Sequence, residues 1–491
     1  MNNLIANAWS VMQPFAPIIV VVVTLLVVML GIALKRSHFL IGTLSVMGLN
    51  IALLLLIGQI MGWVAMPEQP VISAMFIIDP FAQFNMAVIL VAALACCTLA
   101  YPYFRTFKDH KEELYLLLLL STVGALLMVS AHNLASFFMS LELLSVPLYG
   151  MLAYAFMRNR SLESGLKYLV LSATASATLL MGMAFIYAAT GTLQFKEIAL
   201  SLPNVYQSPL MILGAAMMTF AVAFKLSAAP FHIWTADVYQ GAPAPVATYL
   251  ASVTKVAMMA LAIRFLIDAA ILAIPAVQMV LMVVATLSIL FGNLLALRQT
   301  NLKRLLGYSS IAHMGYVMVA ALSVASGAYA ITNMYMAVYA LTSVGLFGVL
   351  TLMSSSYKEE GEAAELYHYR GLFWRRPVLT GVMTVMLLSM AGIPLTAGFI
   401  TKFFAIVAAV DGRQWWLAAM IIVGSAIGLF YYLRVMLTLF KRPNRTMEFD
   451  ALWHWGIQVG GLMVILVTLL VIYVGVLPNN FILWATQSIM W

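Results

Sequence analysis

Long apolar runs alternate with short polar turns along almost the whole chain, and this alternation predicts membrane-spanning helices. A helix that crosses a bilayer needs about 20 predominantly apolar residues. Runs of this kind, bounded by Pro, Gly or charged residues, occur at residues 18–34, 39–62, 80–104, 113–130, 133–157, 161–190, 207–240, 243–268, 273–297, 301–323, 327–354, 377–410, 414–440 and 454–477. We therefore expect an all-α polytopic membrane protein with about fourteen transmembrane helices.

The overall composition supports this prediction. Of the 491 residues 64% are hydrophobic and only 9% are charged, whereas soluble domains carry about 25% charged residues. A net charge of +8 would suggest a nucleic-acid partner in a soluble protein. In a membrane protein it is better explained by loop lysines and arginines on one side of the bilayer, so we expect no nucleic-acid partner.

Basic residues gather in alternate loops, which predicts the orientation. No basic residue precedes the first apolar run, and Lys35 and Arg36 follow it, which is the reverse of the charge order in a cleavable signal peptide. Loops on the same side hold further basic residues, among them Arg105, Arg158, Arg298, Lys303, Arg375 and Lys441. By the positive-inside rule this side is cytoplasmic. Both termini are therefore expected on the periplasmic side of a bacterial inner membrane.

Nothing in the sequence predicts a cofactor or metal site in this chain. Cys96 and Cys97 are adjacent within an apolar run and cannot build a four-thiolate cluster. Neither a GxGxxG nor a GxxxxGK[ST] nucleotide-binding motif is recognisable. Any redox chemistry is therefore expected in partner subunits.

Two of the predicted helices are too long for one straight crossing. Residues 207–240 are interrupted at Pro230, and residues 377–410 at Pro394. Proline removes a backbone donor and clashes with the preceding turn, so both helices should break there. The two are the seventh and the twelfth helices, an odd number of crossings apart, so equivalent helices run in opposite directions. Broken helices in two inverted repeats point to an ion-binding site near the middle of the bilayer.

Four charged residues are predicted deep within the apolar runs. Glu142 lies roughly 16 Å into the fifth helix, at ~1.5 Å per residue. Lys225 precedes the break of the seventh helix, Lys255 lies at similar depth in the eighth, and Lys402 follows the break of the twelfth. A charged side chain at bilayer depth costs ~2.5–3.5 kcal/mol and usually marks an ion pathway.

These residue types suit proton transfer. Burial disfavours the charged form of a lysine, and a nearby carboxylate favours it, so Glu142 and Lys225 can act as a switch that holds or releases a proton. Lys255 can relay that proton sideways, and Lys402 can hold it near the exit. His232 and His313 titrate near neutral pH and can bridge gaps through water. His313 is equally compatible with a hydrogen-bonded histidine of the core.

Other charged residues have simpler explanations. Arg264 and Arg434 lie towards helix ends, where long basic side chains usually reach the headgroups. Glu163 and Lys167 are spaced i,i+4, which favours a surface ion pair of little energetic value over a proton entrance.

Three motifs resemble the signatures of one membrane-protein family. PFHIWTADVYQGAPAPV, QTNLKRLLGYSSIAHMGY and SMAGIPLTAGFITKF are similar to sequences in the antiporter-like subunits of respiratory complex I, the proton-pumping NADH:quinone oxidoreductase. The resemblance covers essentially the whole chain. It implies three N-terminal helices (1–112), two inverted five-helix repeats formed by helices 4–8 (113–268) and 9–13 (273–440), and a C-terminal helix (454–491).

The resemblance also implies roles for the charged residues. Glu142 would be the acid of the fifth helix and Lys225 its partner on the broken seventh, with Lys255 as the connecting lysine and Lys402 as the terminal one. Glu163 and Lys167 match an acidic–basic pair near the cytoplasmic entrance, which strengthens their candidacy. The flavin, the iron–sulfur clusters and the quinone would be bound by other subunits, and the partners would be other membrane-arm subunits, including neighbouring antiporter-like ones.

We therefore expect outward proton translocation driven by quinone reduction elsewhere in a complex. The alternative is a subunit of a multicomponent sodium/proton antiporter. Sodium sites use carboxylate and carbonyl oxygens, whereas the predicted axis consists mainly of lysines, which favours protons. A purely structural scaffold would need neither buried charges nor two broken helices.

Overall fold

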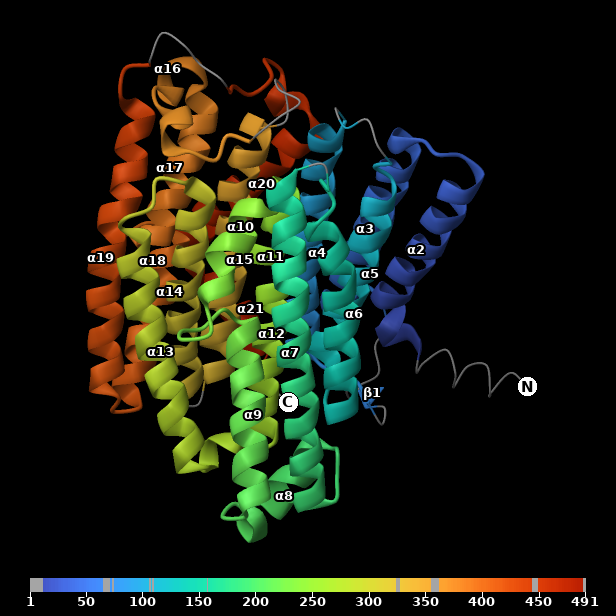
Figure 1. Cartoon of the computed structure of the whole chain (residues 1–491), viewed down its shortest axis with the longest axis vertical. Coiled ribbons are helices and arrows are strands. Elements are labelled where there is room, and N and C mark those ends of the chain that lie inside the picture. Colours follow the sequence, from blue (N-terminus) through green and yellow to red (C-terminus); the bar gives the residue numbers. More distant parts are fainter. Residues whose placement is uncertain are drawn as a thin grey trace.

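The structure is a computed structural model that describes residues 12–64, 71–72, 75–105, 107, 110–156, 158–323, 327–354, 362–443 and 449–488. Within these residues, twelve helices are long and apolar enough to cross a membrane. Within the same residues, two broken helices supply two further crossings, which gives the expected fourteen. Figure 1 shows how these helices are arranged. The prediction of an all-α polytopic membrane protein is confirmed.

The crossings follow the predicted apolar runs in order. The N-terminal ones are α2 (Ala16–Leu34), α3 (His38–Ile60), α4 (Pro80–Phe104), α5 (Glu113–Ser130) and α6 (Leu134–Leu152). The next are α7 (Asn159–Thr190), the broken helix α9 (Pro209–Lys225) with α10 (Ile233–Gly241), and α11 (Ala244–Ala251) with α12 (Val253–Asp268). The last are α13 (Pro275–Ala296), α14 (Leu302–Leu322), α15 (Ala328–Ser354), the broken helix α17 (Pro377–Ala391) with α18 (Ala397–Asp411), α19 (Trp415–Phe440) and α20 (Val459–Val476).

Side-chain caps mark where several crossings begin. The Asp79 carboxylate accepts the backbone N–H of Ala82 at 2.8 Å at the start of α4. Asn133 forms a capping box with Ser136 at the start of α6. Such caps satisfy donors that the first turn of a helix leaves unpaired.

Both proline-marked breaks are present. Seven residues separate α9 from α10, and in this gap Ser227 has a φ of 62°. Five residues separate α17 from α18, and there Gly392 and Leu395 have φ values of 79° and 71°. The eighth crossing is also interrupted, at Ser252 between α11 and α12 (φ −107°, ψ −76°), which the sequence analysis did not anticipate.

Four crossings form the enclosed centre of the bundle. The span windows of α4 and of α11–α12 are each 89% buried, and those of α14 and α15 are each 94% buried, against 28% for the first crossing. Figure 1 shows α2 and α19 at opposite flanks, with α4, α11, α12 and α15 between them. The candidate proton-carrying lysines lie on or against this centre.

Short elements join the crossings. They are a two-residue antiparallel hairpin of β1 (Val71–Ile72) and β2 (Ile77–Ile78), the helices α8 (Phe195–Val205), α16 (Leu372–Arg375) and α21 (Pro478–Gln487), and the 3-10 turns η1 (Gln13–Phe15), η2 (Ile271–Ala273), η3 (Leu366–Tyr369) and η4 (Trp455–Ile457). The hairpin, α8 and α16 lie between the predicted apolar runs, whereas η4 and α21 lie within the predicted C-terminal helix (454–491).

Candidate functional site

Lys225 ends α9 and is held by hydroxyl groups. Its Nζ donates to Ser145 Oγ of α6 at 2.9 Å and to Ser172 Oγ of α7 at 2.7 Å. The side chain is buried, 8% exposed. The break of the seventh helix therefore places an ammonium group between three helices, with neutral acceptors around it.

Glu142 lies on α6, one turn before Ser145, but it does not pair with Lys225 in this conformation. Within the described part of the chain no ion pair of 4.0 Å or less joins the two, and Glu142 Oε1 is buried without a hydrogen-bond partner. Glu142 and Ser145 lie within one turn of α6, and Ser172 lies on the neighbouring α7. In this structure Lys225 is thus turned towards the two serines rather than towards Glu142.

Lys255 is fully buried, and the break of the seventh helix connects it to Lys225. Its Nζ donates to Ser227 Oγ at 2.5 Å and lies 3.4 Å from the backbone carbonyl of Lys225. It also lies 5.5 Å from the ring centroid of Trp234, a distance suited to a cation–π contact. The last carbonyls of a helix lack intrahelical partners and form the negative end of its dipole. The broken end of α9 therefore provides a cation site for Lys255.

Lys402 occupies the equivalent kind of site in the second half of the chain. Its Nζ donates to the carbonyls of Met390 and Ala391, at the end of α17, at 2.9 and 3.1 Å. The side chain is 6% exposed and lies 5.2 Å from the ring centroid of Tyr316. In both broken helices, the carbonyl end of the first half holds a buried lysine.

His313 lies among tyrosines next to Lys402. Its Nδ1 is 3.0 Å from the Tyr335 hydroxyl and its Nε2 is 3.1 Å from the Tyr432 hydroxyl. Its ring also contacts the ring of Tyr316, over which Lys402 lies. His313 is therefore a core histidine with hydrogen bonds to both ring nitrogens, and it lies beside Lys402; its role in proton transfer stays a prediction.

The structure does not bring His232 into this row. Its ring stacks on Phe291 of α13, with centroids 6.1 Å apart and planes 20° apart, and the next residue, Ile233, is 80% exposed. Among the described residues, its side chain forms no hydrogen bond with any of the three lysines, and its Nδ1 is buried without a partner. The bridging role expected of His232 has no contact to support it here.

Glu163 and Lys167 form the predicted ion pair at the basic end of the bundle. The two side chains are 57% and 43% exposed and lie 2.6 Å apart. Lys167 also contacts Asp237 at 3.3 Å, and Asp237 pairs with Arg304 of α14 at 2.6 Å. Glu163, Lys167 and Asp237 line a cavity of about 110 Å³. The pair is thus part of a polar, water-sized opening rather than an isolated surface contact.

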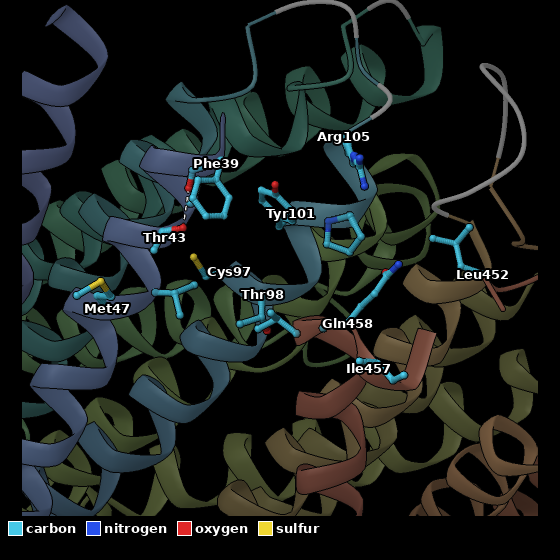
Figure 2. A pocket seen from close by; sticks show the side chains of 15 residues that line it. Phe39, Thr43, Met47, Cys97, Thr98, Tyr101, Arg105, Leu452, Ile457 and Gln458 are labelled. Carbon is cyan, nitrogen blue, oxygen red and sulfur yellow. Dashed lines mark hydrogen bonds between the residues drawn. The ribbon is translucent and has the colours of Figure 1, made fainter. Parts of the chain in front are cut away.

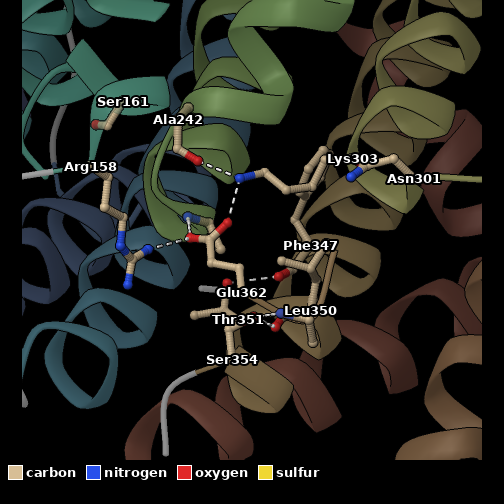
Figure 3. Close-up of polar contacts among 12 residues, drawn as sticks. Arg158, Ser161, Ala242, Asn301, Lys303, Phe347, Leu350, Thr351, Ser354 and Glu362 are labelled. Carbon is tan, nitrogen blue, oxygen red and sulfur yellow. Dashed lines mark hydrogen bonds and ion pairs between the residues drawn. The ribbon is translucent and has the colours of Figure 1, made fainter. Parts of the chain in front are cut away.

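A buried ionic cluster that the sequence analysis missed lies near this opening (Figure 3). Lys303, expected in a cytoplasmic loop, is fully buried and donates to Glu362 Oε2 at 2.5 Å. Glu362 Oε1 accepts the hydroxyl of Tyr103 and the backbone N–H of Ala244 (2.9 Å), and lies 3.7 Å from Arg158.

The cluster joins both halves of the chain through one carboxylate. Burial acts to raise the pKa of the Glu362 carboxyl, but Lys303, Tyr103 and Arg158 outweigh it and hold this pKa below its ordinary value. The sequence does not show that Glu362, which follows α15, pairs with a lysine some 60 residues earlier. The only signal for a specific contact was the long polar loop around Glu362.

The expectation that Arg264 reaches the headgroups is wrong. Its side chain is 3% exposed and forms two hydrogen bonds of 2.8 Å with the carboxylate of Asp79. The Asp79 carboxylate both caps α4 and neutralises this arginine of α12. Arg434 instead donates to the carbonyls of Leu297 and Gln299, at 2.8 and 2.7 Å.

Known proteins share both the sequence and the fold of this chain. Residues 131–428 match the family described as NADH:quinone oxidoreductase/Mrp antiporter, transmembrane. The chain belongs to this family. It is 68% identical over 492 residues to NADH-quinone oxidoreductase subunit N of Psychrobacter arcticus, a match that covers 100% of each chain. The resemblance inferred from the three motifs is confirmed.

Solved structures of the family have the same fold. A chain of respiratory complex I from Thermus thermophilus superposes with a TM-score of 0.82 at 30% identity, covering 96% of this chain and 99% of that one. A chain of the Mrp complex from Dietzia sp. DQ12-45-1b gives a TM-score of 0.83 at 20% identity, covering 97% of each chain. The second match shows the shared fold alone, so the antiporter-like architecture is common to both kinds of complex.

Proposed function

We propose that this chain is the proton-translocating subunit N in the membrane arm of a bacterial NADH:quinone oxidoreductase. The observation that carries the proposal concerns the hydrogen bonds of three buried lysines. Among the described residues, Lys225, Lys255 and Lys402 donate to hydroxyl or carbonyl oxygens, and none of them forms an ion pair with a carboxylate. A lysine bound to neutral acceptors can release its proton without leaving an unpaired carboxylate behind.

Protons enter at the basic end through the cavity lined by Glu163, Lys167 and Asp237. They reach Lys225, whose affinity for a proton depends on whether it faces the serines or Glu142. Lys255 takes the proton across the break of the seventh helix. Waters carry it on past the tyrosines around His313 to Lys402. His232 lies outside this route.

The redox reaction takes place elsewhere in the complex. Other subunits bind the flavin, the iron–sulfur clusters and the quinone, and this chain contacts other membrane-arm subunits, including neighbouring antiporter-like ones. Quinone reduction in those subunits drives the outward movement of protons here. The chain is therefore part of an oxidoreductase without carrying a redox centre.

The chain is organised as three N-terminal helices (1–112), two inverted five-helix repeats (113–268 and 273–440) and a C-terminal helix (454–491). Matching helix pairs support the repeats: α5 packs on α6 as α13 packs on α14, and α7 packs on α9 as α15 packs on α17. Both termini lie on the periplasmic side of the bacterial inner membrane. Residues 1–11 and 489–491 lie outside the described part, but Ser488 bonds to Asn333 near the start of α15, at the end opposite the basic loops.

Replacing Lys225 with Ala tests the proton role directly. We expect the complex to assemble and to lose most of its proton pumping, measured as acidification of inverted membrane vesicles during NADH oxidation. Lys196→Ala, which removes an exposed lysine of α8, is the matched control and should pump normally. Undiminished pumping by the Lys225 variant would exclude the role given to that lysine.

Purification of the tagged chain from its native membrane separates the proposal from the antiporter alternative. A particle with NADH:quinone reductase activity and flavin and iron–sulfur spectra places the chain in complex I. A colourless particle of membrane subunits that exchanges sodium for protons without NADH places it in a multicomponent antiporter.

A further inference from the structure

A cavity of about 540 Å³ opens between α3, α4 and the start of α20 (Figure 2). Lys225, Lys255 and Lys402 do not line it. This volume lies in the range of roughly 300–1,000 Å³ that is usual for small-molecule sites. Its lining comes from three separate segments, residues 39–47, 97–105 and 452–460. None of the residues assigned to proton transfer lines it.

The cavity is open to the hydrocarbon layer. Its rim carries apolar side chains that are largely exposed: Phe39 is 68% exposed, Met47 54% and Ile457 79%. Along α4 the lining extends from Arg105 to Cys97, eight residues or about 12 Å at ~1.5 Å per residue. A ligand with a long apolar body can therefore enter sideways from the bilayer and lie along α4.

One end of the cavity is polar and positively charged. Arg105 and Gln458 line the same end, and their polar groups are directed into it in Figure 2. Lys111 donates to the backbone carbonyl of Arg105 at 2.8 Å, which brings a second cation to this end. Lys35 lies at the same end of the bundle, directly after α2.

We propose that this cavity binds an anionic phospholipid, with one acyl chain along α4 and the phosphate at Arg105. The end of the bundle with the basic loops is where anionic headgroups are attracted by lysine and arginine. A zwitterionic lipid or an uncharged isoprenoid ligand fills the apolar part equally well but gains less from the cations. The recognition therefore depends on the charge of the headgroup.

Photolabelling of the intact complex tests this assignment. The complex is reconstituted in vesicles that contain a trace of phosphatidylglycerol with a diazirine in one acyl chain, or of the matching phosphatidylethanolamine. After illumination, mass spectrometry locates the adducts. We expect adducts on segments 39–47, 97–105 and 452–460, at several-fold higher yield from phosphatidylglycerol.

Two variants separate the charge from the shape of the site. Arg105→Gln should lower the phosphatidylglycerol adducts about fivefold, the usual effect of one basic residue near a membrane surface. Thr43→Phe fills the cavity from an exposed position of α3 and should abolish the adducts while Arg105 is intact. Arg298→Gln, an exposed arginine at the same end, is the control and should change nothing.

Three results would overturn the assignment. Equal adducts from both lipids, or adducts unaffected by Arg105→Gln, mean that hydrocarbon fills the cavity without headgroup recognition. Adducts elsewhere on the chain but none on the three segments mean that a neighbouring subunit covers the cavity. NADH:quinone reductase activity of each variant confirms that its complex is assembled.

Discussion

At the scale of single residues, the structure separates two kinds of buried lysine. Lys225, Lys255 and Lys402 contact hydroxyl or carbonyl oxygens, whereas Lys303 contacts the carboxylate of Glu362. A buried ammonium paired with a carboxylate is fixed in its charged form, because losing the proton leaves the carboxylate unpaired. This difference supports the proposed proton-transfer role of the first three lysines and predicts a structural role for Lys303.

The first prediction uses the chemistry of arginine to test this division. Arginine keeps its charge under all physiological conditions and cannot give up a proton. Lys255→Arg should therefore lower proton pumping by about tenfold or more. Lys255→Met should lower it to the same extent, although only this second variant removes the charge. Proton pumping of vesicles relative to NADH oxidation is the measurement. Normal pumping in the arginine variant would show that Lys255 acts only through its charge.

The second prediction concerns the pH dependence of the Glu362 cluster. Because the pKa of Glu362 is held below its ordinary value of about 4.3, the unfolded chain takes up this proton first as the pH falls. The stabilisation is fully present above about pH 4.3 and is lost as the pH falls through the folded-state pKa. Glu362→Gln should cost about 3 kcal/mol at pH 7, and less at lower pH.

A thermal-shift assay of the purified complex at a series of pH values measures this difference. The double variant Glu362→Gln with Lys303→Met should recover part of the lost stability, because it no longer leaves a buried cation without its partner. Equal destabilisation of the single variant at pH 7 and below pH 4 would show that the carboxylate charge is not what stabilises the cluster.

The charged residues buried within the bundle could be predicted from the sequence, but the groups that accept their hydrogen bonds could not. Lys225, Lys255 and Lys402 were visible because a charge interrupts an apolar run. The acceptors of their hydrogen bonds, such as Ser145 and Ser172, are ordinary helix residues that only three-dimensional packing selects. For the same reason, the partner of Lys225 in this conformation is a pair of hydroxyls rather than the predicted carboxylate.

At the scale of elements, the two helix breaks at prolines could be predicted from the sequence. The third break, which lies among hydroxyl side chains of the eighth crossing, was not predicted. Pro230 and Pro394 marked the two broken helices correctly. At the third interruption, the hydroxyls of Thr248, Ser252 and Thr254 each donate to the carbonyl four residues earlier. Such bonds compete with the helix and often bend it. The cluster of three hydroxyl residues just before Lys255 was the available signal.

The third prediction tests how the break of the twelfth helix positions Lys402. Gly392 has a φ of 79°, and a Cβ added there would lie 2.8 Å from Lys402 Cδ. Gly392→Ala should therefore displace the lysine and strain the turn by about 1–3 kcal/mol. We expect reduced proton pumping with the complex still assembled. Gly381→Ala on α17, where a Cβ meets nothing within 4 Å, is the control and should pump normally.

At the scale of the whole molecule, hydrophobic patterning predicted the number and order of the crossings. The bilayer imposes a length and a composition on every crossing, so the sequence records them directly. The connecting elements obey no such rule. The hairpin and the start of α8 bond to residues 131–134, and α21 packs on α15, which are contacts between segments far apart in the sequence. The contacts of Glu362 could not be predicted for the same reason. Glu362 bonds to the start of α11 and to α14, and the sequence does not specify the path of the loop that brings it there.

The fourth prediction tests the orientation of the whole chain. Basic loops gather at one end of the bundle, and the positive-inside rule predicts that this end is cytoplasmic. Lys196 on α8 and Arg298 after α13 are both exposed and lie at opposite ends of the bundle. The native Cys96 and Cys97 are fully buried, so a cysteine introduced at either position is the reactive thiol of the folded chain.

In right-side-out vesicles, a membrane-impermeant maleimide should label Lys196→Cys and leave Arg298→Cys unlabelled until the membrane is opened with detergent. In inverted vesicles the order should reverse, because the same two positions then face the opposite compartments. The reversed pattern in both preparations would place the Glu163–Lys167 opening outside. Protons would then enter from the periplasm, and the proposed outward direction of transfer could not hold.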